Sequence, residues 1–178
     1  SLSNRLRKVG AEMVGTFALV FAGCGAIAVA SAQPGVMGHG AVCAVFGLVI
    51  MVMIFATGHI SGAHFNPAVT VAFAVIRRFS WREVPLYVCG QVLAATAAAF
   101  LLRFLLGSDA ELGVTQPLAT LTLLQAGVIE VILTAFLMFV ITAVATDSRA
   151  VGHMAGLAIG GTVALCALFG GPVSGASM

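Results

Sequence analysis

Five apolar stretches, each long enough to cross a bilayer, decide the class of this protein. As α-helices rising about 1.5 Å per residue they would span a hydrocarbon core of ~30 Å. They cover residues 9–32, 41–58, 81–106, 124–146 and 151–169. Charged residues make up only 8% of the 178 positions, whereas soluble domains are about one quarter charged. We therefore expect an all-α, multi-pass membrane protein and exclude a soluble or disordered chain.

Positive charges are distributed unevenly among the short connections. If the N-terminus is cytoplasmic, the cytoplasmic side carries Arg5, Arg7, Lys8, Arg77, Arg78, Arg82 and Arg149. Only Arg103 then lies near the outer face, and the acidic Asp109 follows it. Cytoplasmic connections are enriched in Lys and Arg, so we expect this orientation.

The segment from His59 to Ile76 does not have the pattern of a span. It is polar and Gly-rich first and apolar afterwards. Asn66 is a typical N-cap and Pro67 a typical first helical residue, so a short helix should run from Asn66 to about Ile76. Both neighbouring spans end on the same side, which predicts a re-entrant half-helix. Such irregular backbone is tolerated at membrane depth only where it lines a cavity.

Two parts of the sequence repeat each other. At one constant offset, Glu12, Thr16, Leu19 and Phe21 recur as Glu130, Thr134, Leu137 and Phe139. Ser61-Gly62-Ala63 recurs as Ser174-Gly175-Ala176. An odd number of spans separates the copies, so the second copy is inverted in the membrane, an arrangement that places a substrate site near the midplane.

The repeat also predicts how the chain is organised. We expect one transmembrane channel domain over residues 1–178, with a first repeat over about 9–106 and an incomplete second repeat over about 124–178. Met178 corresponds to Phe65, so the counterpart of Asn66 would be the next residue. We therefore interpret the chain as truncated, with a second half-helix and a sixth span in the full protein.

The stretch Ser61-Gly62-Ala63-His64-Phe65-Asn66-Pro67-Ala68-Val69-Thr70 resembles the first signature loop of the major intrinsic protein family, the aquaporins and glyceroporins. Residues 171–178 are similar to the approach to that family's second signature loop. Residues 73–81 and 174–178 most resemble the nodulin-like intrinsic proteins and their bacterial relatives. The resemblance implies an aquaporin-like, right-handed helical bundle with six spans in the full protein. It also implies a homotetramer, and the bacterial relatives suggest a bacterial inner membrane.

Physical chemistry gives the half-helix a role in conduction. Its N-terminus carries about half a positive charge, which repels cations and protons. The motif Asn66-Pro67-Ala68 places an amide donor there, which can orient a permeating oxygen. The preceding backbone carbonyls of Gly62, Ala63, His64 and Phe65 would line the path as acceptors. We expect a passive channel for water and small uncharged solutes that excludes ions and protons.

The resemblance implies that the narrowest part of the pore involves Phe46, Ala167 and Ala176. A fourth member, an arginine, would follow Met178. Ala167 stands where strict water channels have a histidine, so a wider filter is expected, passing glycerol, urea or uncharged metalloid hydroxides. A water-only channel is the alternative. From the residues alone, ordinary helix packing explains Phe46 and Ala167 better than a pore role does, and only the resemblance favours the pore.

Glu12 and Glu130 are ionisable residues within spans, where such groups are functional or structural pivots. One interpretation is that each carboxylate accepts hydrogen bonds from the backbone of its own re-entrant loop. The other is a proton-coupled site at Glu12 and Glu130, which would make the protein a secondary transporter.

Several other functions are excluded. No nucleophile, base and orienting group cluster in any loop, so we do not expect an enzyme. His59 and His64 have no Cys or carboxylate at ligand spacing, so neither a metal nor a cofactor is expected. The net charge of +2 without a basic patch excludes a nucleic-acid partner. Gly156 and Gly160 form a G-x-x-x-G pattern typical of closely packed membrane helices.

Overall fold

The computed structural model describes residues 2–146 and 152–178, and this part of the chain is entirely helical apart from its connections. The helices are α1 (Leu2–Ala32), α2 (His39–Ser61), α3 (Pro67–Val75), α4 (Val84–Leu106), α5 (Leu123–Thr146) and α6 (Ala155–Ser174), with the short 3₁₀ turn η1 (Gly152–Met154) before α6. Five of them are long and apolar enough to cross a membrane, and the sixth, α3, is the short helix. The predicted membrane fold with a half-helix is therefore confirmed.

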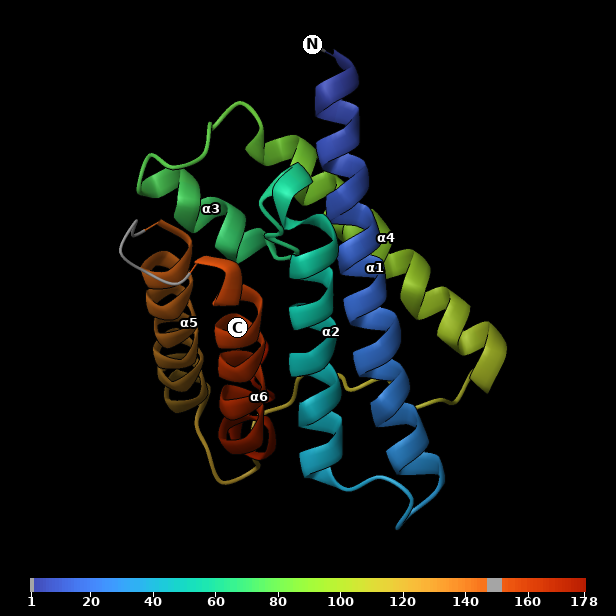
Figure 1. Ribbon diagram of the computed structural model, residues 1–178. Coiled ribbons are helices and arrows are strands. Elements are labelled where there is room, and N and C mark those ends of the chain that lie inside the picture. Colours follow the sequence, from blue (N-terminus) through green and yellow to red (C-terminus); the bar gives the residue numbers. More distant parts are fainter. Residues whose placement is uncertain (1, 147–151) are drawn as a thin grey trace.

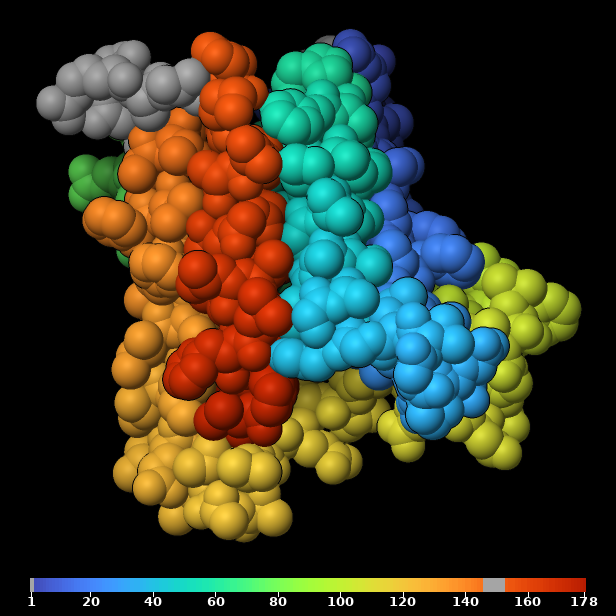
Figure 2. Space-filling view, turned by 60° about the horizontal axis from the view of Figure 1, so that its bottom comes forward, coloured from blue at the N-terminus to red at the C-terminus, as the bar shows by residue number. Residues whose placement is uncertain are grey.

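The long helices form a bundle in which α2 has a central position. It packs against α1 on one side and α6 on the other, while α4 packs on α1 and α5 on α6 (Figure 1). Figure 2 shows α2 and α6 touching along much of their length. The last residues fold back from the end of α6, so the C-terminal residue lies partway along the bundle in Figure 1.

Glycines make the contact between α2 and α6 possible. A Cβ atom on Gly160 would lie 2.4 Å from the carbonyl oxygen of Gly47, and one on Gly47 would lie 2.5 Å from that of Gly160. A Cβ on Gly156 would lie 3.1 Å from the carbonyl oxygen of Met51. The backbones of the two helices therefore approach each other directly, as the G-x-x-x-G pattern predicts.

The predicted bounds of most helices are met within about four residues, but two helix ends lie further away. α1 begins at Leu2 instead of residue 9, because its charged first turns continue the helix beyond the apolar stretch. There Arg5 Nε lies 2.9 Å from Glu83 Oε1, which joins this end of α1 to the connection before α4. The positively charged start of α1 therefore lies at the same end of the bundle as the connection over residues 77–82, which is also positively charged (Figure 1). Arg149 was assigned to the same end, but it lies outside the described residues.

α6 continues to Ser174 instead of ending near residue 169. It passes through Pro172 and is capped by Gly175, which has the left-handed φ of 97° that a glycine cap adopts readily. The second loop, residues 175–178, therefore begins at a defined helix end, as the first loop does at Gly62, where φ is 91°.

Candidate functional site

Asn66 organises the start of α3. Its Oδ1 accepts a hydrogen bond from the backbone N–H of Ala68 at 2.7 Å, and Pro67 occupies the first helical turn. Its Nδ2 donates to the carbonyl oxygen of Met178 at 2.7 Å. An amide nitrogen carries two hydrogens, and the second has no partner among residues 2–146 and 152–178. Asn66 therefore caps the half-helix, joins the two loops and keeps one free donor.

The loop before α3 is strained. Gly62 has a positive φ of 91°, and so do Ala63 and Phe65, at 53° and 51°. For residues with a side chain this conformation costs about 1–3 kcal/mol each, so surrounding contacts must hold it. Glu12 provides them: its Oε1 accepts from the N–H of His64 at 2.9 Å and its Oε2 from that of Phe65 at 2.7 Å.

The second loop repeats this arrangement. Ala176 and Met178 have φ values of 46° and 45°. Glu130 Oε1 accepts from the N–H of Ser177 at 3.2 Å, and Oε2 accepts from that of Met178 at 2.9 Å. The two acids thus bind equivalent loop positions in the same order. Their environments differ, because Glu12 is fully buried and Glu130 is half-buried.

A polar network behind the first loop was not predicted from the sequence. Gln91 Nε2 donates to Glu12 Oε2 at 2.9 Å and to Thr70 Oγ1 at 3.0 Å. The Thr70 hydroxyl donates its only hydrogen to the carbonyl of Asn66. His64 Nδ1, 3.1 Å from Thr70 Oγ1, must therefore carry a hydrogen and donate it. The available signal was a lone Gln in the middle of an apolar stretch.

Aromatic rings surround His64 on its other sides. The ring centroids of Phe73 and Phe79 lie 4.9 Å from that of His64, and the Tyr87 centroid lies 5.3 Å away. The Tyr87 hydroxyl donates to the carbonyl of Ser61 at 2.7 Å. These contacts and the Thr70 bond fix the orientation of the imidazole.

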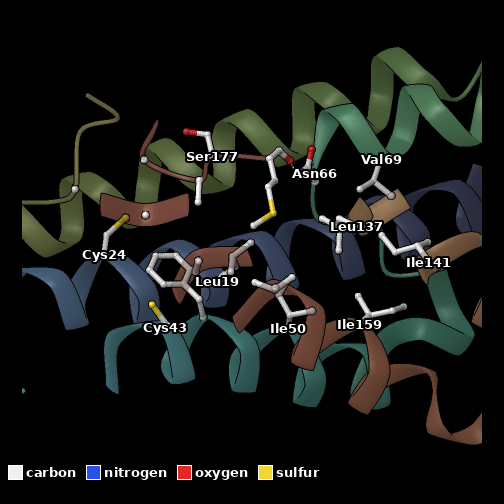
Figure 3. Close-up of a pocket in the computed structure, with 18 of the residues that line it drawn as sticks. Leu19, Cys24, Cys43, Ile50, Asn66, Val69, Leu137, Ile141, Ile159 and Ser177 are labelled. Carbon is white, nitrogen blue, oxygen red and sulfur yellow. Dashed lines mark hydrogen bonds between the residues drawn. The ribbon is translucent and has the colours of Figure 1, made fainter. Parts of the chain in front are cut away.

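A cavity of about 770 Å³ runs along the two loops. In Figure 3, Cys24 and Cys43 lie toward one end, Ile141 and Ile159 lie toward the other, and Asn66 lies between them. The predicted pore residues on its wall are Phe46, Gly62, Ala63, His64, Asn66, Ala167 and Ala176.

The other predicted residues lie behind this wall. Phe65 is buried in the core, with its ring against Gly15, and does not line the cavity. Pro67 and Ala68 form the first turn of α3, and only Asn66 of the Asn-Pro-Ala motif is on the cavity wall. Neither Glu12 nor Glu130 lines it.

One stretch of the wall comes from the connection between α4 and α5. Residues 113–116 border the cavity. Thr115 Oγ1 lies 2.5 Å from Ser177 Oγ, and Leu118 N donates to the carbonyl of Val173 at 2.9 Å. This connection is therefore fastened to the second loop. Nothing in the composition of this connection signals the contact.

No metal centre is formed within residues 2–146 and 152–178. In this part of the chain no three His, Cys, Asp or Glu side chains are grouped closely enough to hold an ion. The cavity wall is mostly apolar, and its polar side chains are those of His39, His64, Asn66, Thr115, Gln116 and Ser177.

Comparison with known proteins identifies the family. The profile of the family described as "MIP: Major intrinsic protein" matches residues 1–178. The chain is 51% identical over 173 residues to aquaporin NIP1-1 of Oryza sativa subsp. japonica, a match that covers 97% of this chain and 61% of the relative. It is 49% identical over 179 residues to aquaporin NIP1-2 of Arabidopsis thaliana, covering 97% and 61% respectively.

Among solved structures, the X-ray structure of the aquaglyceroporin from Plasmodium falciparum is similar, with a TM-score of 0.82 and 28% identity. The match covers 97% of this chain and 75% of that one. The chain thus spans about 61% of the length of the curated relatives named above. Those relatives are plant proteins, so they give no support to a bacterial inner membrane. The match over the whole chain and the shared fold show that this protein belongs to the major intrinsic protein family.

Proposed function

We propose that this protein is a passive channel for water and small neutral solutes. The observation that carries the proposal is the position of Asn66, which lies on the wall of the cavity, caps the N-terminus of α3 and has one amide hydrogen without a partner among the described residues. This hydrogen can be donated to a permeating oxygen. The same helix end carries a partial positive charge, which disfavours cations and protons.

The small side chains on the cavity wall support solutes larger than water. Ala167 and Ala176 have only methyl side chains there, and Phe46 contributes an apolar ring. Such a wall suits the carbon skeleton of a polyol, urea or an uncharged metalloid hydroxide. The family relatives named above are aquaporins, and the solved structure is of an aquaglyceroporin. Selectivity for these solutes, exclusion of ions and assembly as a homotetramer with one pore per subunit are parts of the proposal.

The secondary-transporter alternative is less favoured. A proton-coupled site would need Glu12 or Glu130 to face the path, and neither lines the cavity. Both oxygens of each carboxylate already accept hydrogen bonds from loop N–H groups. Protonating either acid would remove acceptors on which the strained loops depend. The two acids are therefore better suited to supporting the loops permanently than to cycling between protonation states.

The test is stopped-flow light scattering on proteoliposomes containing the complete natural protein. We expect fast water flux together with glycerol, urea or metalloid uptake and no ion conductance. Replacing Ala167 with His should reduce solute flux more than water flux, and Ala167→Leu is the matched control for lost volume without a polar group. Water flux without any solute uptake would refute the wide filter, and equal loss of both fluxes in both variants would mean that Ala167 only packs.

A further inference from the structure

The ring of Phe46 lies directly on the backbone of α1 at Gly23. A Cβ atom at Gly23 would lie 2.2 Å from Phe46 Cε1 and 2.4 Å from its Cζ. Real Cβ atoms essentially never come closer than 3.0 Å to another heavy atom, so no residue other than glycine fits there without a shift. Gly23 itself is buried and does not line the cavity, whereas Phe46 does.

We propose that Gly23 is a specificity-determining residue that acts through Phe46. By lacking a side chain, it lets the ring lie against α1 and keeps it out of the path. This inference rests on the proposed channel function and extends it from the residues of the filter wall to the helix behind that wall.

The direction of the effect follows from what surrounds the ring. α1 closes one side of Phe46, and the cavity opens on another. An added methyl at Gly23 would require the ring to move until the separation approaches the 3.4 Å of ordinary contact. Protein interiors are close-packed, so the ring moves toward the empty space instead of into its neighbours. The path should become narrower beside Ala167 and Ala176.

The same helix offers two matched controls. A Cβ at Gly15 would lie 2.0 Å from Phe65 Cε1, an equally severe overlap, but Phe65 is a core residue that does not line the cavity. A Cβ at Gly10 would meet nothing within 4 Å. Gly15→Ala therefore tests the effect of disturbing α1 packing, and Gly10→Ala tests the effect of the substitution itself.

The experiment compares glycerol, urea and water permeabilities of the complete protein in proteoliposomes. Gly23→Ala should lower glycerol and urea flux severalfold and water flux less, whereas Gly10→Ala should change neither. Gly15→Ala displaces Phe65, which precedes Asn66 in the first loop, so it should lower the fluxes of water and solutes alike. An unchanged ratio in Gly23→Ala would overturn the proposal.

Removing the ring gives an independent arm. In a Phe46→Ala background, adding Gly23→Ala should leave the flux ratio unchanged, because no ring remains to be displaced. An effect of Gly23→Ala in that background would refute the proposal even if the single variant fails to fold. If the natural protein passes only water, the wide filter is wrong, but the Gly23 proposal is still tested by water flux. That flux must then fall in Gly23→Ala and must not fall further when the substitution is added to Phe46→Ala.

Discussion

The Nε2 atom of His39 lies 3.0 Å from the carbonyl oxygen of Leu168 and joins the start of α2 to the end of α6. A carbonyl can only accept, so the imidazole is the donor. Within α6 this carbonyl would accept from the residue four positions later, but that residue is Pro172, which has no N–H. His39 therefore supplies, from another helix, the donor that the proline removes.

This relationship predicts an energetic coupling between His39 and Pro172. His39→Ala leaves the Leu168 carbonyl dependent on water and should reduce the free energy of unfolding by about 0.5–1.5 kcal/mol. In a Pro172→Ala background the helix provides its own N–H, so His39→Ala should then have a smaller effect. A double-mutant cycle on detergent-solubilised protein measures the difference. Additive effects would show that the two residues act independently.

Glu12 and Glu130 should respond unequally to the same substitution. Gln keeps one acceptor oxygen but places an NH₂ group opposite a loop N–H, which leaves that N–H donor unsatisfied. At the fully buried Glu12, where Gln91 also depends on the carboxylate, we expect Glu12→Gln to cost about 1–3 kcal/mol. At the half-buried Glu130 water can replace the lost acceptor, so Glu130→Gln should cost less.

Thermal unfolding of the two variants tests this ranking. Hydrogen exchange gives a second readout, because the amides of His64 and Phe65 should lose protection in Glu12→Gln while those of the second loop do not. A larger destabilisation by Glu130→Gln would contradict the argument from burial.

Local chemistry explains why parts of the fold were predictable. The start of α3 was predicted to the residue because capping by Asn66 and the preference for Pro67 at the first turn depend only on neighbours in sequence. The start of α1 and the end of α6 were not, because hydropathy reports the apolar stretch and not the helix, which continues in charged turns and through Pro172.

The interactions behind the cavity wall could not be predicted in the same way. The repeat indicated that Glu12 and Glu130 are equivalent, and hydrogen bonding of each to its loop was one of two interpretations. Which loop atoms they bind, and the links through Gln91 and Thr70, depend on how α1, α3 and α4 meet in space. The overlap of Gly23 with Phe46 likewise joins residues of two helices, and no local pattern encodes it.

The distribution of charge predicts which end of the bundle faces the cytoplasm. Arg78 belongs to the connection that Glu83 ties to the N-terminal end of α1, and Asp109 lies in the connection that follows α4. Single cysteines at positions 78 and 109, placed in a variant without the exposed native Cys89, should label from opposite sides with a membrane-impermeant maleimide. We expect position 109 to react from outside in intact cells. Labelling of position 109 only after lysis would reverse the proposed orientation.

Neighbouring glycines in α6 provide the sharpest test of the close contact with α2. A Cβ at Gly160 would lie 2.4 Å from the carbonyl oxygen of Gly47, whereas a Cβ at Gly161 would meet nothing within 4 Å. Backbone atoms cannot rotate away as a flexible side chain can, so Gly160→Ala must separate the two helices. Overpacking of this kind typically costs about 1–3 kcal/mol. Gly161→Ala should be neutral or stabilising by up to about 1 kcal/mol, because alanine is the better helix former. Thermal unfolding of both variants in the same detergent compares them directly. Equal stability would mean that the α2–α6 contact has enough freedom to accept a methyl group, and the direct approach of the two backbones would then not be what holds these helices together.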